Sequence, residues 1–273
     1  MKILIISLSA AVISFLLAAG MVFLLVKVSK RGINHTKRER FLEILSVWIA
    51  LYIFGGIGYF SIYTHCGQKA MEALESDERV TISEIERAWL FDGPGTDDVL
   101  VFYPGAKVDE KAYAPLCRRL AEDGIDCIVV KMPLHMAFTD RAAAERYRSQ
   151  YDYVHWYLGG HSLGGAMAAA FAAQNTGHWD GLVLLAAYST APLPQMKCCS
   201  VYGDQDGVMD WEQYDAGKSF WPEDAKQLVI AGGNHAQFGD YGAQRGDGTA
   251  TITAEEQVSL TADFIEFTLN SLH

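Results

Sequence analysis

The sequence predicts an α/β protein with a doubly wound, mostly parallel sheet, preceded by an N-terminal transmembrane hairpin of two helices. Three observations support this class. Short apolar runs alternate with amphipathic stretches along residues 87–273, a pattern typical of a parallel sheet with helices on both faces. One apolar run ends in a Gly-x-Ser-x-Gly turn around Ser162 and is followed directly by helix-forming residues. Two uncharged stretches, residues 3–26 and 44–63, come before this region.

Each uncharged stretch is about as long as the ~20 residues that a helix needs to cross a bilayer. A cleaved signal peptide is the alternative for residues 3–26, but this apolar run is longer than the usual apolar core of about 7 to 15 residues. Neither stretch confines its apolar residues to one stripe, which argues against a buried core helix. We therefore expect a membrane hairpin over residues 1–65, with the lipid bilayer as a partner.

The charge distribution predicts how such a hairpin is oriented. Six Lys and Arg residues and one Glu within residues 27–41 give this connection a net charge of +5, which favours the cytoplasmic side. From Cys66 onward, 15 Lys and Arg stand against 31 Asp and Glu, a net charge of −16. Such a surface disfavours nucleic acid. We expect a multi-pass cell-membrane protein whose large domain, residues 87–273, is extracytoplasmic and joined by a polar, helical connector over residues 66–86.

The elements of the large domain follow from local patterns. Residues 125–131 form a continuous apolar run, typical of a strand buried on both faces. The last helix opens with Thr253 and Glu256 at capping-box spacing, and the first ends before Gly124. The expected strands cover residues 88–91, 99–103, 125–131, 154–158, 182–187, 198–202 and 228–231; the expected helices cover residues 110–121, 142–151, 163–174 and 253–272.

The turn around Ser162 has the form of a nucleophile elbow. A sharp strand-to-helix turn strains its central residue, and the flanking Gly160 and Gly164 lack side chains that would collide with the neighbouring strand and helix. The strain lifts the Ser162 hydroxyl above the sheet edge and directs the backbone amide of Leu163 at the space in front of it. A serine at this position is predicted to act as a nucleophile.

Serine needs a neutral imidazole to take its proton, and the imidazole needs a carboxylate to fix its tautomer. Asp204 and Asp206 follow the strand expected at 198–202, and His235 follows the strand expected at 228–231. The carboxyl ends of parallel strands share one edge of the sheet, where the chemistry of such folds collects. Serine, acid and histidine therefore occur in the order of successive strands.

The remaining histidines and cysteines predict no further chemistry. His161 lies beside the serine and is expected to shape the turn, because a residue adjacent to the nucleophile points away from it. His135, His155 and His178 have no metal-ligand spacing, so neither a metal nor a cofactor is expected. The five cysteines form no disulfide framework and are expected to be mostly buried thiols.

With these motifs, residues 87–273 resemble the α/β-hydrolase superfamily, specifically its compact, lidless branch similar in shape to dienelactone hydrolases. The resemblance implies that Asp206 is the acid of the triad, and that the backbone amides of Ala106 and Leu163 form the oxyanion hole. Dienelactone hydrolases carry a cysteine nucleophile. The presence of Ser162 here favours ordinary ester chemistry.

The expected function is that of a membrane-anchored serine hydrolase that cleaves a small-molecule ester or related acyl compound through an acyl-enzyme. A non-catalytic binding module of the same fold is the alternative class, and an acyltransferase or peptidase would use the same triad. Ten residues separate Ala187 from Cys198, too few to fold as a lid. We therefore expect an open site, bordered by the Ala106 loop, residues 132–138 and residues 188–193.

Overall fold

The computed structural model describes residues 36–95 and 97–270. The chain divides into two compact units, residues 1–62 and 63–273. In the first unit, α2 spans Lys37–Ser61. Its first turn is closed by a capping box, because Thr36 Oγ1 accepts a hydrogen bond from the Glu39 N–H while the Glu39 carboxylate accepts one from the Thr36 N–H.

The predicted transmembrane hairpin is wrong. Among residues 36–95 and 97–270, no helix is both long enough and apolar enough to cross a membrane. The predicted span 44–63 falls mostly within α2, whose first turn is charged and whose last two turns contain three glycines. Glycine contributes no apolar side chain, so it dilutes the hydrophobic character of the segment. The other predicted span, residues 3–26, lies outside the described residues.

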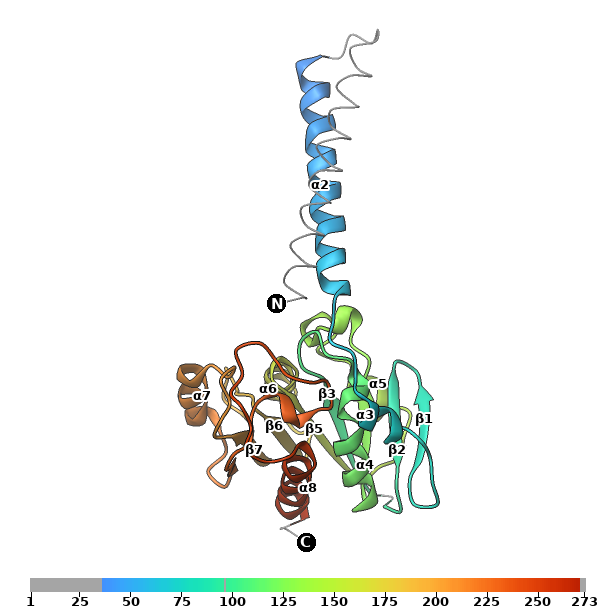
Figure 1. The fold of residues 1–273 in the computed structure, drawn as a ribbon, viewed down its shortest axis with the longest axis vertical. Coiled ribbons are helices and arrows are strands. Elements are labelled where there is room, and N and C mark those ends of the chain that lie inside the picture. Colours follow the sequence, from blue (N-terminus) through green and yellow to red (C-terminus); the bar gives the residue numbers. More distant parts are fainter. Residues whose placement is uncertain (1–35, 96, 271–273) are drawn as a thin grey trace. The chain divides into compact units, whose positions relative to one another are not determined.

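The second unit is built on one eight-stranded sheet with the order β1-β2-β4-β3-β5-β6-β7-β8 (Figure 1). β1 pairs antiparallel with β2, and β2 pairs antiparallel with β4, whereas all other neighbours are parallel. The mostly parallel α/β sheet expected from the sequence is confirmed. The strands are β1 (Thr81–Ile85), β2 (Ala88–Asp92), β3 (Asp98–Tyr103), β4 (Ile125–Val130), β5 (His155–His161), β6 (Gly181–Leu185), β7 (Lys197–Gly203) and β8 (Lys226–Ile230).

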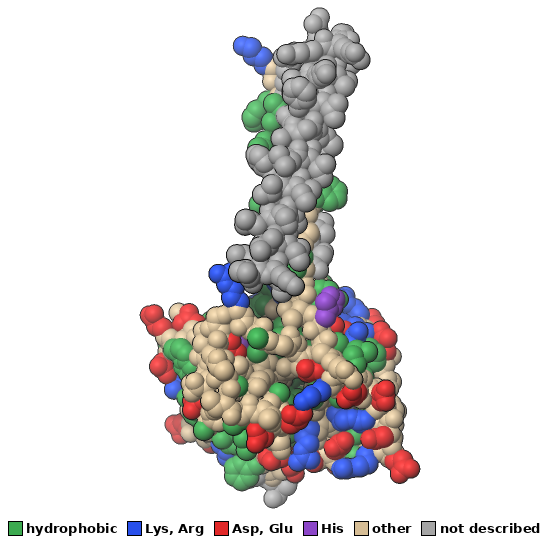
Figure 2. Space-filling model, viewed as in Figure 1, with side chains coloured by type: hydrophobic (Ala, Val, Ile, Leu, Met, Phe, Trp, Pro, Cys, Tyr) green, Lys and Arg blue, Asp and Glu red, His purple; other side chains and the backbone are tan. Residues whose placement is uncertain are grey.

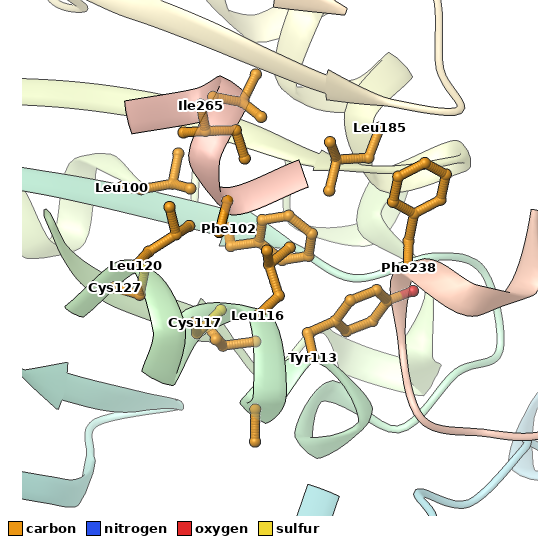
Figure 3. Close-up of a cluster of buried hydrophobic side chains, with 14 of the residues drawn as sticks. Leu100, Phe102, Tyr113, Leu116, Cys117, Leu120, Cys127, Leu185, Phe238 and Ile265 are labelled. Carbon is orange, nitrogen blue, oxygen red and sulfur yellow. The ribbon is translucent and has the colours of Figure 1, made fainter. Parts of the chain in front are cut away.

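Helices cover both faces of this sheet. Alternate residues of β3 separate the two cores, because Phe102 packs into one buried cluster and Val101 into the other. The Phe102 cluster includes side chains of α4 (Ala114–Glu122) and α8 (Ala254–Asn270), and Figure 3 shows Leu116, Leu120 and Ile265 packed around it. The opposite cluster includes Ala168 and Ala169 of α6 (Leu163–Gln174).

The shorter elements depart most from the sequence expectation. Residues 66–86 were expected to be helical, but contain only the short α3 (Gln68–Glu72) and the edge strand β1. The helix expected at 142–151 is reduced to α5 (Glu145–Arg148). There the Ala144 N–H donates to the Tyr103 hydroxyl, and Tyr147 is tied to the backbone of residues 86 and 87. These tertiary bonds override the local helical preference. α7 (Trp211–Gly217) was not expected.

The loop between β6 and β7 is short. Residues 186–196 contain no helix or strand, so no cap domain is inserted there.

The surface of the second unit carries many acidic side chains, which are spread over its viewed face (Figure 2). All five cysteines are free, and four of them are buried.

Candidate active site

Ser162 occupies the sharp turn between β5 and α6. It follows the last residue of β5 and precedes the first residue of α6. Its backbone lies at φ 53° and ψ −125°, a region that residues other than glycine rarely adopt. A Cβ on Gly160 or on Gly164 would collide with the carbonyl oxygen of Tyr103. The two glycines therefore let the turn approach β3 closely, as expected for an elbow.

Asp206 and His235 form a buried pair on the two loops that follow β7 and β8. The Nδ1 atom of His235 lies 2.7 Å from Oδ2 of Asp206, and the two side chains are 1% and 0% exposed. The other carboxylate oxygen of Asp206 accepts hydrogen bonds from the N–H groups of Val208 and Met209, at 2.8 and 2.9 Å. These bonds hold the Asp206 carboxylate in place, so that its Oδ2 accepts the proton on Nδ1 of His235.

The Nε2 atom of His235 is therefore the open position of the ring. It is buried and has no hydrogen-bond partner among the described residues. The ring lies beside the elbow, because its centroid is 4.5 Å from that of His161, the residue before Ser162. Hydrogen bonds of a catalytic base are often long without substrate and tighten only in the reacting complex. The arrangement places an unprotonated nitrogen next to the serine turn.

Asp204, the other acid candidate from the sequence, is used differently. Its Oδ1 accepts hydrogen bonds from the Gly232 N–H at 2.7 Å and from the Gln205 side chain at 3.0 Å. These contacts hold the start of the loop that carries His235. The structure therefore brings Asp206 to the imidazole and directs Asp204 to the backbone.

Asp247 is a residue that sequence reasoning missed. Its Oδ1 accepts hydrogen bonds from the N–H groups of Gly207, His235 and Gly248, and its Oδ2 accepts one from the N–H of Ala236. The carboxylate therefore joins the loop that carries the acid to the loop that carries the histidine. The sequence offers only a Gly-Asp-Gly turn here, and nothing in that turn indicates which distant amides it meets.

The loop after β3 holds the predicted oxyanion donor. The Gly105 N–H donates to the Tyr113 hydroxyl at 3.0 Å, and the Lys107 N–H donates to the carbonyl oxygen of His135 at 2.8 Å. The N–H of Ala106, between these two fixed amides, makes no hydrogen bond to any residue the structure describes. The same holds for the N–H of Leu163 at the start of α6. Unpaired amides are what an oxyanion hole requires.

The loop after β3 is also held by Thr64, a residue that the sequence analysis did not single out. Thr64 lies alongside Val108 as a short parallel bridge: its N–H donates to the Lys107 carbonyl at 2.7 Å, and its carbonyl accepts from the Asp109 N–H at 2.9 Å. Next to it, the rings of Tyr63 and His135 stack with their centroids 3.7 Å apart. No local pattern predicts a pairing over such a sequence distance.

The other predicted histidine roles can be compared with their contacts. His161 is buried, and burial together with the neighbouring His235 holds its pKa well below the ordinary range, so its ring is neutral. His155 lies 2.9 Å from Asp98, and His178 lies 2.7 Å from Glu145. In the part of the chain that the structure describes, no group of three His, Cys, Asp or Glu side chains is arranged to hold a metal ion.

The family comparison agrees with this arrangement. A model described as the alpha/beta hydrolase family matches residues 99–259, which include Ser162, Asp206 and His235. The chain belongs to the α/β-hydrolase family. The resemblance seen in the sequence is thereby confirmed, and the protein is a hydrolase by class. No curated protein matches the sequence.

Solved structures show the same fold at low sequence identity. Carboxyl esterase 2 from the mycorrhizal fungus Tuber melanosporum is similar with a TM-score of 0.55 at 12% identity, covering 77% of this chain and 91% of that one. TT1662 from Thermus thermophilus is similar with a TM-score of 0.52 at 14% identity, covering 70% and 99%. The alpha/beta hydrolase domain-containing protein 10 from mouse is similar with a TM-score of 0.52 at 12% identity, covering 71% and 99%.

Proposed function

We propose that the protein is a serine hydrolase that cleaves small carboxylic esters through an acyl-enzyme, with Ser162 as nucleophile, His235 as base and Asp206 as the acid of the triad. One observation carries this proposal: the buried His235–Asp206 pair leaves Nε2 without a partner beside a serine in a strained turn. A binding module would have no need for a serine in such a turn or for an unpaired buried nitrogen next to it.

The first half of the reaction transfers the acyl group to the enzyme. Ser162 Oγ attacks the acyl carbon while its proton passes to Nε2 of His235, and the resulting imidazolium is stabilised by the Asp206 carboxylate. The carbonyl oxygen becomes negatively charged and accepts hydrogen bonds from the N–H groups of Ala106 and Leu163. His235 then returns the proton to the departing alkoxide as the carbon–oxygen bond breaks.

The second half releases the acid. His235 takes a proton from water, the hydroxide attacks the acyl carbon of the Ser162 ester, and the same two amides stabilise the tetrahedral oxyanion. His235 then protonates Ser162 Oγ as the acyl–oxygen bond breaks. The proton returns to the serine, so no cofactor takes part in the cycle.

Two observations support an ester as substrate. The neighbour from Tuber melanosporum is named a carboxyl esterase, which favours this class within the shared fold. No helix or strand is inserted at residues 186–196, so a dissolved ester has no cap to displace. We expect the rate to rise hyperbolically with the concentration of short-chain esters. A jump above the critical micelle concentration would indicate a mobile cover.

The test is the Ser162→Ala variant of the full chain, assayed against p-nitrophenyl esters of two, four and eight acyl carbons. We expect turnover to fall by roughly 10⁶, as for serine knockouts in other triads, with unchanged circular dichroism and melting temperature. Ser149→Ala, at an exposed serine whose hydroxyl bonds the Arg146 carbonyl, serves as the matched control. A folded Ser162→Ala variant that keeps about one percent of wild-type activity or more would place the nucleophile elsewhere.

A further inference from the structure

A buried hydrogen-bond chain connects the loop after β3 to the elbow. Tyr113 ends the 3₁₀ turn Glu110–Tyr113, and His161 is the last residue of β5. The Gly105 N–H donates to the Tyr113 hydroxyl at 3.0 Å, and the same hydroxyl lies 2.8 Å from Nδ1 of His161. The Tyr113 hydroxyl oxygen therefore joins the loop after β3, the 3₁₀ turn and the last residue of β5, which precedes Ser162.

The protonation states along this chain are mutually consistent. Burial lowers the pKa of His161 and raises the pKa of Tyr113, so both groups are neutral. With the proton of the neutral His161 ring on Nε2, the Tyr113 oxygen accepts from Gly105 and donates its own proton to Nδ1 of His161. Figure 3 shows the Tyr113 ring in the buried cluster, with its hydroxyl directed toward Phe238, and the Phe238 ring lies 5.6 Å from that of His161.

The fit around Gly105 is tight. A Cβ atom at this position would lie 2.9 Å from both the Tyr113 hydroxyl oxygen and Nδ1 of His161, a distance that non-bonded carbon does not tolerate without a shift. Gly105 can therefore move little relative to the two side chains. The next residue is Ala106, whose N–H is directed to no described partner.

We propose that Tyr113 and His161 are positioning residues for the oxyanion hole, because they fix Gly105, and with it the Ala106 N–H, relative to Ser162. The inference rests on the proposed serine hydrolase function and adds residues that do not touch the substrate. Donors for a developing oxyanion act best when they are held in place before the reaction. Loss of the hydroxyl leaves the donor present but imprecisely placed.

The first test compares Tyr113→Phe with Tyr103→Phe. Tyr103 is an equally buried tyrosine on the opposite face of the sheet, and its hydroxyl also makes two hydrogen bonds, to the Arg141 carbonyl and from the Ala144 N–H. The two variants should therefore lower the melting temperature to a similar extent. Only Tyr113→Phe should lower kcat, by about 10- to 100-fold, less than the 10²–10³ seen when an oxyanion donor is removed outright.

Two readouts separate positioning from general destabilisation. KM of the Tyr113→Phe variant should stay within about twofold of wild type, because ground-state binding does not use the oxyanion contact. The inhibition constant of a trifluoromethyl ketone, whose adduct with Ser162 carries an oxyanion, should rise by about the same factor as kcat falls. A melting temperature lowered as in Tyr103→Phe, with kcat also changed no more than in that control, would overturn the inference.

A second pair keeps the test available if Tyr113→Phe does not fold. His161→Asn and His161→Leu are nearly isosteric, and both remove the ring beside His235, but only asparagine retains an acceptor near the position of Nδ1. The asparagine variant should have a kcat at least about fivefold above the leucine variant. Equal values would contradict the role assigned to the hydrogen bond.

Labelling the wild-type chain with a fluorophosphonate separates the two levels of the proposal. A chain that is not labelled at Ser162 would refute the serine hydrolase function and the positioning role with it. A chain that is labelled, and whose labelling rate is unchanged in Tyr113→Phe, would refute the positioning role alone.

Discussion

Two histidine–aspartate pairs lie at opposite strand ends of the same sheet. His235 and Asp206 follow the carboxyl ends of β8 and β7, with 2.7 Å between Nδ1 and Oδ2. His155 and Asp98 are the first residues of β5 and β3, with 2.9 Å between Nδ1 and Oδ1. The hydrogen bond is nearly the same, but the side chains of the first pair are 1% and 0% exposed, and those of the second 28% and 18%.

The surroundings of the two pairs explain why only one is a catalytic candidate. One oxygen of the Asp206 carboxylate accepts two backbone amides, and the Nε2 of His235 is buried without a described partner beside the serine turn. Asp98 instead shares its Oδ1 with the Tyr157 hydroxyl at 3.1 Å. His155 starts the strand that Ser162 follows, so about 20 Å of extended chain separates them. A histidine–aspartate bond is insufficient without a nucleophile within reach.

The largest expected contrast is between His235→Ala and His155→Ala. Loss of the base should lower kcat for an activated ester by roughly 10⁵–10⁶, because serine and histidine act as one unit. The same substitution at His155 should leave kcat within about twofold of wild type, since His155 lies at the opposite end of β5 from Ser162. The measurement is steady-state hydrolysis of p-nitrophenyl butyrate. A similar loss in both variants would mean that the two pairs are not functionally distinct.

Substitution of Asp206 should also lower kcat more than substitution of Asp98, but by a smaller factor than for the two histidines. Asp206→Asn should lower kcat by roughly 10⁴, because the amide no longer selects the tautomer with its proton on Nδ1. Asp98→Asn should change kcat less than about threefold, since the partner of His155 lies far from the reaction. Both values come from ester hydrolysis by folded variants. A greater loss in Asp98→Asn would reverse the assignment of the two ends.

Asp247 is expected to hold the loops that follow β7 and β8 in place. Asp247→Asn replaces one acceptor oxygen with an amide, leaving part of the N–H set of Gly207, His235 and Ala236 without a partner. We expect kcat to fall about tenfold through misplacement of the base, and the free energy of unfolding to fall by about 1–3 kcal/mol. Asp204→Asn is the matched control, because the Asp204 carboxylate accepts one hydrogen bond from the same loop, from the Gly232 N–H. If kcat of Asp204→Asn falls as far as kcat of Asp247→Asn, Asp247 has no specific role in placing His235.

The smallest expected effect is a pH dependence of stability caused by Asp126, the second residue of β4. Burial raises the pKa of Asp126 to about 6, against an ordinary value of 3.8. Between these values the folded chain keeps a proton that the unfolded chain releases, so the free energy of unfolding falls as the pH rises through this window. Asp126→Asn should remove this decline, at most about 3 kcal/mol. Urea unfolding at pH 4, 5, 6 and 7 measures it, with exposed Asp152→Asn as control. A slope unchanged in Asp126→Asn would contradict the buried environment.

The parallel core of the fold could be predicted from the sequence because its signals are local. The apolar run at 125–131 and the small residues after Ser162 each fit one element, and α6 has the predicted bounds 163–174. The order of Ser162, Asp206 and His235 along successive strands also follows from the chain, because parallel strands share an edge.

The residues that the sequence did not reveal are those that act through distant contacts. Asp247 meets the backbone of residues 207 and 235–236, and Thr64 pairs with residues 107–109. β1 and α7 are too short for a periodic signal. The expected helix at 142–151 is interrupted by the hydrogen bonds from the Ala144 N–H to Tyr103 and from the Tyr147 hydroxyl to the Glu86 carbonyl. The predicted transmembrane hairpin was wrong because an uncharged stretch was taken as sufficient for a membrane span.

The most direct measurement of the central claim is the covalent adduct. The full chain is treated with a fluorophosphonate and digested, and the modified residue is located by mass spectrometry. We predict one adduct per chain, on Ser162, formed by wild type and His155→Ala but lost in His235→Ala, because the serine reacts only when the buried pair at the carboxyl end removes its proton. An adduct on another residue, or equal labelling of Ser162 in the two histidine variants, would contradict the account.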